Sequence, residues 1–148
     1  MGAPVVSATR LVVAAALVDD VDRPGSVLAA RRSAPASLAG GWELPGGKVE
    51  PGEDPEAALH RELGEELGVR VELGRRLASA EPDGDWPLSS ALGMRVWLAR
   101  VVEGEPAPLE DHDELRVLPR DRWGDVAWLP GDVAPLEALA RSSGWAGG

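Results

Sequence analysis

The chain has no cysteine and no tyrosine, and no apolar run long enough to cross a membrane. Without cysteine neither a disulfide framework nor a thiolate metal site can form, so any metal must be held by oxygen or by His60 and His112. The apolar run at 11–18 lacks the basic leader of a secretion signal, and position 6 is valine where a myristoylation site needs Ser or Thr. We therefore expect a cytoplasmic protein without membrane attachment.

Basic side chains are also scarce. The 25 acidic residues outnumber the 15 Lys and Arg, which gives a net charge of −10. Such a charge disfavours binding to a nucleic-acid polymer or to an anionic membrane surface, and an anionic small molecule would need a metal cation to offset the repulsion. With 148 residues the chain can bury one core and is too short for two ordinary domains. We expect a single domain over residues 1–148, as a monomer or a homodimer.

Strand patterns precede and follow one strong helix signal. The β-branched segment 5–18 and the segment 26–31 are joined by turn-forming residues and are expected to form a hairpin. The remaining strands are expected at 69–73, 76–80, 94–101 and 115–118, with loops at 82–87 and 104–108, a second helix at 135–141 and a frayed tail at 142–148. This order predicts a mixed α/β sheet with helices on its faces.

The strong helix signal covers residues 55–67. Asp54 suits the N-cap, Pro55 suits the first helical position, and Gly68 suits the C-terminal stop. The buried side of the helix is expected to carry leucines at every fourth position, which are Leu59, Leu63 and Leu67.

Three glutamates share another face of this helix. Glu62, Glu65 and Glu66 are separated by three or four residues, so their carboxylates project on the same side. A solvated acidic face is the simpler interpretation of such a triplet. Like charges at these offsets repel each other, however, unless a cation lies among them, and carboxylates are ligands that Mg²⁺ and Mn²⁺ prefer.

The residues around the triplet follow a restricted pattern. It runs Gly47, five residues, Glu53, seven residues, Arg61-Glu62-Leu63, one residue, Glu65-Glu66, one residue, Gly68-Val69. This segment, 47–69, resembles the complete Nudix box. A chance match at nine restricted positions is negligible in a chain of this length.

The resemblance implies the Nudix fold, an α/β/α sandwich with a mixed β-sheet, and a Mg²⁺-dependent hydrolase in which Mn²⁺ can substitute. By the family pattern Glu62, Glu65 and Glu66 hold the metal together with a backbone carbonyl of Gly46 or Gly47. A carboxylate must accept the proton of the attacking water, and we choose Glu62 for this base, with Glu53 as the second choice. Arg61 is expected to orient Glu53 and the metal ligands, unless it forms only an ordinary ion pair on the helix surface.

Outside the box the chain is similar to the MutT-like branch of the family, which includes 8-oxo-dGTP diphosphatases and CTP or dCTP pyrophosphatases. The segment 42–50 matches the branch's entry to the box, so the resemblance places five residues at the nucleotide: Glu43, Leu44, Pro45, Gly46 and Gly47. Arg32, at the end of the second expected strand, matches a nucleotide-contacting position, although it also suits a plain strand end.

Two acidic residues further along extend this similarity. Asp111 stands where the branch usually has a fourth metal-coordinating glutamate, and a shorter aspartate can reach the metal through water or be an ordinary loop acid. Asp132, after Trp128-Leu129-Pro130-Gly131, matches the residue that reads the base. An ionised aspartate only accepts hydrogen bonds, which favours the exocyclic amine of cytosine over 8-oxoguanine, and the alternative role for Asp132 is a helix cap.

The expected reaction is hydrolysis of a nucleoside triphosphate, of the CTP/dCTP type or 8-oxo-dGTP, to a monophosphate and pyrophosphate. The lack of tyrosine argues against diadenosine polyphosphate hydrolases, in which a tyrosine is expected downstream of the box. ADP-ribose pyrophosphatases usually place a proline where this chain has Gly84, but Pro82 and Pro87 lie near and keep that activity as the second choice. A nucleotide-binding sensor without catalysis is the alternative of another class. Such sensors commonly lose box carboxylates, and this chain has all of them.

Overall fold

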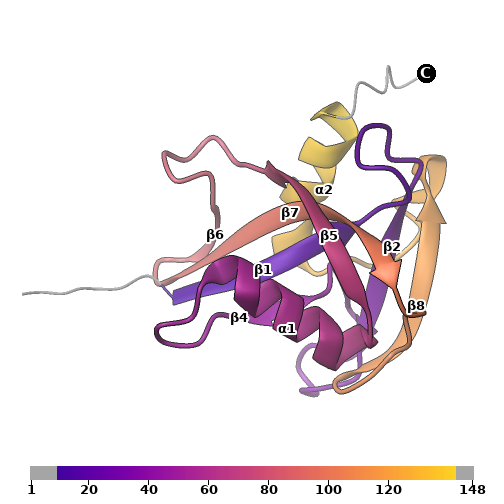
Figure 1. Ribbon diagram of the computed structural model, residues 1–148, viewed down its shortest axis with the longest axis horizontal. Helices are drawn as coiled ribbons and strands as arrows, with labels where there is room; N and C mark the ends of the chain where they lie inside the picture. The colour runs from indigo at the N-terminus through magenta and orange to yellow at the C-terminus, as the bar shows by residue number, and fades with distance from the viewer. Residues whose placement is uncertain (1–9, 143–148) are drawn as a thin grey trace, which may run out of the picture.

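Strand β1 (Arg10–Leu17) lies inside the larger sheet of the computed structural model, which describes residues 10–142 (Figure 1). It pairs in parallel with β7 (Leu92–Glu103) and antiparallel with the short β4 (Gly46–Lys48). On the other side of β7 lie β5 (Arg70–Leu77) and β6 (Trp86–Ser89), both antiparallel to it. One parallel pair among antiparallel pairs makes this sheet mixed, as the sequence predicts.

The expected hairpin between the first two strands is wrong. Strand β2 (Ser26–Arg32) belongs to a second, antiparallel sheet with β3 (Trp42–Glu43) and β8 (His112–Pro119), and it meets the end of β1 only at the bridge between Val18 and Val27. The reason is that β1 is buried on both faces from Val13 to Leu17. The buried backbone N–H and C=O groups of such a strand need hydrogen-bond partners along both edges, and β4 and β7 lie along the two edges of β1.

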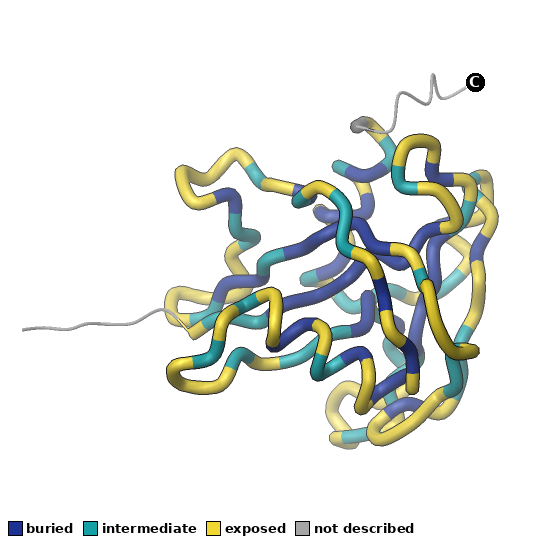
Figure 2. The backbone as a smooth tube through the Cα atoms, viewed as in Figure 1, coloured by how far each residue is buried: buried dark blue, intermediate teal, exposed yellow. Residues whose placement is uncertain are grey.

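Two helices cover opposite faces of the larger sheet. Alternate residues of β1 point to opposite sides, so that Val13, Ala15 and Leu17 share a core cluster with the leucines of helix α1 (Pro55–Leu67). Ala14 and Ala16 pack in the other cluster, which contains Leu136 and Leu139 of helix α2 (Pro130–Ser142). Figure 2 shows the buried stretches running through this central layer while the outer turns are exposed. The layers therefore form the predicted α/β/α sandwich.

Helix α1 has the predicted bounds, and Leu59, Leu63 and Leu67 are fully buried. Asp54 accepts the N–H groups of Glu56 and Ala57, each at 3.1 Å. Gly68 ends the helix in a left-handed conformation with φ of 74°, which glycine adopts without strain.

Other boundaries differ from the predictions. Strand β5 is continuous where two strands were expected, with a register irregularity between Leu73 and Arg76, and β6 begins inside the predicted loop 82–87. Helix α2 begins at Pro130, five residues before the predicted start, because Pro130 fits a first helical position and Pro135 is accommodated inside the helix. A 3-10 turn, Arg120–Arg122, follows β8.

The first part of the predicted strand 5–18 and nearly all of the predicted frayed tail lie outside the described residues. Within residues 10–142, no helix has both the length and the apolar character to span a bilayer.

Replacing Asp54 by Ala should lower the free energy of unfolding by about 1 kcal/mol, because two N–H groups of α1 lose their acceptor. For a chain of this size the melting temperature should fall by about 2–4 °C, as measured by circular dichroism. Asp54→Ser keeps a capping oxygen and should retain most of the stability. Equal destabilisation by the two substitutions would show that the cap does not act through its oxygen.

Candidate active site

A pocket of about 490 Å³ opens where β1, β4, β6, β7 and the start of α2 meet. Six of the seven residues expected at the nucleotide line it: Arg32, Glu43, Leu44, Gly46, Gly47 and Asp132. Pro45 is not among the lining residues. It is fully buried behind them, and its carbonyl accepts the N–H of Ala15 at 2.9 Å. The pocket thus brings together segments that lie far apart in the sequence.

Strand β4 separates this pocket from the glutamates of α1. The N–H of Gly46 donates to Oε1 of the buried Glu66 at 3.3 Å. Gly47 faces Glu62 so closely that an added Cβ atom would lie 2.3 Å from the carboxylate carbon. The third glutamate, Glu65, is on the exposed side of the helix. Gly46 and Gly47 therefore contact the acidic cluster while also lining the pocket.

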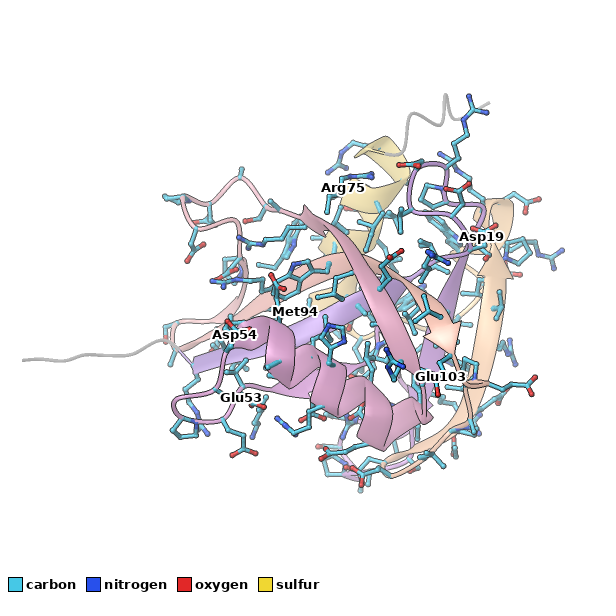
Figure 3. The ribbon with its side chains drawn as sticks, viewed as in Figure 1. Asp19, Glu53, Asp54, Arg75, Met94 and Glu103 are labelled. Atoms are coloured by element: carbon cyan, nitrogen blue, oxygen red, sulfur yellow. The ribbon has the colours of Figure 1, made fainter. Side chains whose placement is uncertain are left out.

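Arg61 is the cation of this cluster. Its guanidinium donates to both carboxylate oxygens of Glu53, at 2.9 and 3.0 Å, and its Nη1 donates to Glu62 at 3.1 Å and to Glu65 at 3.2 Å. Its Nη2 also donates to the carbonyl of Lys48 at 3.2 Å, which connects α1 to β4. Glu53 and Asp54, labelled in Figure 3, lie at the start of α1, so the contacts of this one arginine extend from the residue before the helix cap to Glu65 near the end of the helix.

The acids of the cluster differ in their protonation. The hydrogen bonds from Arg61 lower the pKa of Glu53 to about 2. Burial raises the pKa of Glu66 to about 7, although His112 nearby opposes this shift, and burial also raises the pKa of Glu62 against the opposing charge of Arg61. The anionic forms of the buried glutamates therefore lack sufficient positive charge around them.

The chemistry of these residues suits a divalent cation. Three carboxylates within two turns of one helix offer the hard oxygen ligands that Mg²⁺ and Mn²⁺ prefer, and an added positive charge would stabilise the anions that burial disfavours. Among residues 10–142 no three acidic or histidine side chains converge on one point as metal ligands. Glu62 and Glu65 instead form ion pairs with Nη1 of Arg61.

A second charged network lies on the smaller sheet. Oε2 of Glu43 contacts Nη1 of Arg32 at 3.0 Å and Nε2 of the buried His112 at 2.8 Å. Burial of His112 opposes its protonation, but the hydrogen bond to Glu43 and the charge of Glu66 raise its pKa overall. Asp111 is 61% exposed and its nearest ion-pair partner is Arg32, at 3.7 Å. Arg32 therefore forms ion pairs with two acidic residues of the protein, Glu43 on β3 and Asp111 in the loop before β8.

Asp132 lies in the first turn of α2 and is buried at the pocket. Its Oδ1 accepts the N–H of Leu44 at 3.1 Å, which joins α2 to the segment that enters the box. Burial raises the pKa of Asp132 to about 7, with a further contribution from Glu43 and an opposing one from the Leu44 hydrogen bond. Near neutral pH the side chain therefore populates both the carboxylate and the acid.

Several lining residues escaped the sequence analysis. Leu38, Leu88, Met94 and Leu129 give the pocket an apolar wall, and Lys48 adds a cation (Met94 is labelled in Figure 3). Nothing in the local sequence distinguishes these leucines from core residues. For His112 the neighbouring Asp111 pattern was a signal, but its contact with Glu43 depends on the pairing of β2 with β8.

Comparison with known proteins identifies the family. The NUDIX domain model matches residues 8–142, and the chain belongs to this family. A Mycobacterium tuberculosis protein named "Putative 8-oxo-dGTP diphosphatase 2" is 41% identical over 134 residues, which cover 90% of this chain and 89% of that protein. The CTP pyrophosphohydrolase of Escherichia coli K12 is 49% identical over 59 residues, 40% of this chain and 44% of that one.

The crystal structure of a MutT NUDIX hydrolase from Burkholderia pseudomallei superimposes with a TM-score of 0.72 at 31% identity, covering 88% of this chain and 97% of that one. The expected Nudix fold is confirmed, and so is the similarity to the MutT-like branch. The protein is a Nudix hydrolase that acts on phosphoric anhydrides.

Alanine at the two adjacent glycines should have different effects. In Gly46→Ala the new Cβ would lie 1.9 Å from the carbonyl oxygen of Val13, so β4 must move from β1, at a cost of about 1–3 kcal/mol of folding free energy. In Gly47→Ala the obstacle is the flexible end of Glu62, which can rotate away. We expect Gly47→Ala to retain its melting temperature and lose most of its turnover. A stable Gly46→Ala, or a fully active Gly47→Ala, would contradict this geometry.

The burial of Asp132 makes its contribution to stability depend on pH. Because its folded pKa of about 7 exceeds the ordinary value of 3.8, the folded protein retains a proton between these two pH values that the unfolded chain releases. The contribution is therefore present below the lower pKa and is lost as the pH rises through the higher one. Asp132→Asn keeps the acceptor for Leu44 and does not titrate, so its advantage in melting temperature over the parent should grow from pH 5 to pH 8. A constant difference would exclude a raised pKa.

Proposed function

We propose that this hydrolase cleaves a nucleoside triphosphate to a nucleoside monophosphate and pyrophosphate, with Mg²⁺ or Mn²⁺ bound by Glu62, Glu65, Glu66 and the Gly46 carbonyl. The observation that carries the proposal is the double contact of β4. Gly46 and Gly47 touch the carboxylates of α1 and also line the pocket that ends at Asp132. A nucleotide in the pocket would therefore have its phosphates beside the acids and its base beside α2.

The bound metal would neutralise the phosphate oxygens and lower the pKa of the attacking water. Glu62 is the proposed general base. Only one oxygen of Glu62 accepts a hydrogen bond from Arg61. Both oxygens of Glu53 accept from Arg61, and Oε1 of Glu53 also accepts the N–H of Glu50 at 3.0 Å. Glu53 and Arg61 are therefore proposed to hold the catalytic carboxylates in position. Asp111 remains a proposed additional ligand that would act through water.

In the proposed reaction water attacks the β-phosphorus, and Glu62 accepts its proton. The bond between the β-phosphorus and the oxygen that bridges to the α-phosphorus breaks, so the monophosphate leaves with that oxygen. The water oxygen ends in pyrophosphate. Arg32 and Glu43 are proposed to contribute to the nucleotide site as a rigid pair, because each is already held by the other.

For the base we propose 8-oxo-dGTP first and CTP or dCTP second. The relative whose name carries 8-oxo-dGTP matches nearly the full chain, whereas the CTP-hydrolysing relative matches over 40% of it. The carboxylate of Asp132 favours cytosine, since it accepts from an exocyclic amine, but its acid form donates as well. The raised pKa therefore weakens the preference for cytosine that an ionised aspartate alone would indicate. ADP-ribose is the remaining alternative.

Hydrolysis in ¹⁸O-labelled water tests the reaction. A panel of 8-oxo-dGTP, dGTP, CTP, dCTP and ADP-ribose is compared by kcat/KM with Mg²⁺, and mass spectrometry then locates the label. We expect a triphosphate to be preferred, the label to appear in pyrophosphate, and chelation to abolish turnover. Glu66→Gln should lower kcat by about 100-fold or more because a charged metal ligand is lost, and it should not lower the melting temperature because burial disfavours the charge that it removes.

Each alternative gives a different result. Label in the monophosphate would place the attack on the α-phosphorus, and preference for ADP-ribose would replace the triphosphate assignment. Normal turnover of Glu66→Gln would remove this residue from the metal site. Binding without turnover of any nucleotide would support a sensor.

A further inference from the structure

Residues 78–91, which we call the β6 arm, connect β5 to β7 and contain β6. The arm carries Leu88 to the wall of the pocket, where its side chain is 36% exposed. Leu88 packs onto the start of α2, since a Cβ atom at Gly131 would lie 2.6 Å from Cδ2 of Leu88. Gly131 directly precedes Asp132. Leu88 therefore presents an incompletely covered apolar surface beside the residue proposed to read the base.

The β6 arm is joined to the larger sheet by a short run of backbone pairing with β7. In the described chain β6 pairs only with β7, and the register shifts between Pro87 and Ser89. Such an edge strand needs further support to keep one side chain in a defined position.

Asp85, just before β6, supplies that support. Its side chain is 12% exposed and accepts two hydrogen bonds from Arg95, at 2.7 Å to Oδ1 and 3.0 Å to Oδ2. Oδ1 also accepts from Nη2 of Arg76 at 2.8 Å. Arg95 comes from β7 and Arg76 from β5, so one carboxylate joins the arm to two strands of the main sheet.

Neighbouring contacts fix both the arginines and the arm. The guanidinium of Arg76 lies over the ring of Trp97, 5.9 Å from its centroid, and Nη2 also donates to the carbonyl of Asp83 at 3.1 Å. The hydroxyl of Ser79 donates to the carbonyl of Asp85 at 2.5 Å, and the indole of Trp86 donates to the carbonyl of Leu77 at 2.9 Å. Asp85 is thus the centre of a partly buried network in which Arg95 binds both of its carboxylate oxygens.

We propose that Leu88 contacts the base of the bound nucleotide and that Asp85 is a positioning residue, which acts on substrate binding through Leu88. This inference rests on the proposed function for the nature of the substrate. A base whose edge meets Asp132 would lay the flat face of its ring over the exposed surface of Leu88, and release of Asp85 from the arginines would let the arm carry Leu88 away. The loss of this contact would weaken binding of the base and would leave the carboxylates of α1 unchanged.

A double-mutant cycle tests the link between the two residues. Leu88→Ala and Asp85→Asn are each expected to raise KM about tenfold for the best substrate, because an apolar contact is lost, with kcat within about twofold of the parent. If Asp85 acts through Leu88, the double variant should raise KM no further than Leu88→Ala alone. Inhibition by the nucleoside monophosphate should weaken in parallel, whereas inhibition by pyrophosphate should not change.

Glu72→Gln is the matched control. Glu72 accepts from Arg100 at 2.9 Å across β5 and β7, in the same sheet but with both side chains exposed and neither at the pocket. It should leave KM unchanged. If Asp85→Asn does not fold, Gly131→Ala takes its place in the cycle. The Cβ atom added at residue 131 would push Leu88 away from the start of α2.

The outcomes separate this inference from the proposed function. Additive increases in KM would show that Asp85 does not act through Leu88, and an unchanged KM in Leu88→Ala would exclude its contact with the base. A fall in kcat with constant KM would also overturn the inference. The substrate panel on the parent protein tests the function independently, and the cycle is run on whichever nucleotide the parent hydrolyses.

Discussion

The active site depends on how closely the backbone of β4 lies against β1. At residue 46 the two strands leave no room for a Cβ atom, which would be 1.9 Å from the carbonyl of Val13, so glycine is required there. This contact sets the height of β4 over α1. It brings the N–H of Gly46 to Glu66, and it turns toward Glu62 the side of Gly47 on which any other residue would carry a side chain. Because residues 46–48 also line the pocket, one backbone contact determines the separation between the acids and the cavity.

Negative charge in this site exceeds the positive charge that the protein itself supplies. In a chain with a net charge of −10, four carboxylates of the box are gathered around the single guanidinium of Arg61, or buried beside it. Arg61 neutralises part of this charge and keeps Glu53 ionised and in place. The remaining negative charge disfavours the anionic forms of the buried glutamates, and it is this charge that the proposed Mg²⁺ or Mn²⁺ would offset.

The sequence predicted the parts of the fold that have a local physical cause. Helix α1 has the expected bounds because Asp54, Pro55 and Gly68 act within one turn of its ends. The three glutamates of the box were also placed correctly on this helix, whereas the short strands β3 and β4 at its entry were not predicted. The hairpin prediction failed because Asp22, Pro24 and Gly25 indicate a turn but not which strands will pair. Leu88 and Asp85 were missed since their significance depends on Arg76, Arg95 and Gly131, contacts that only the folded sheet creates.

The parallel pairing of β1 with β7 has a consequence for biosynthesis. Arg10 pairs with Leu92 and Leu17 with Ala99, so more than half of the 148-residue chain separates the partners. The entropy of closing this loop must be met before the centre of the larger sheet exists, which makes such contacts slow to form. On the ribosome β1, apolar on both faces, remains without its main neighbour until β7 has been synthesised. Helix α1, with its own caps, is the element able to cover one face of β1 during that interval.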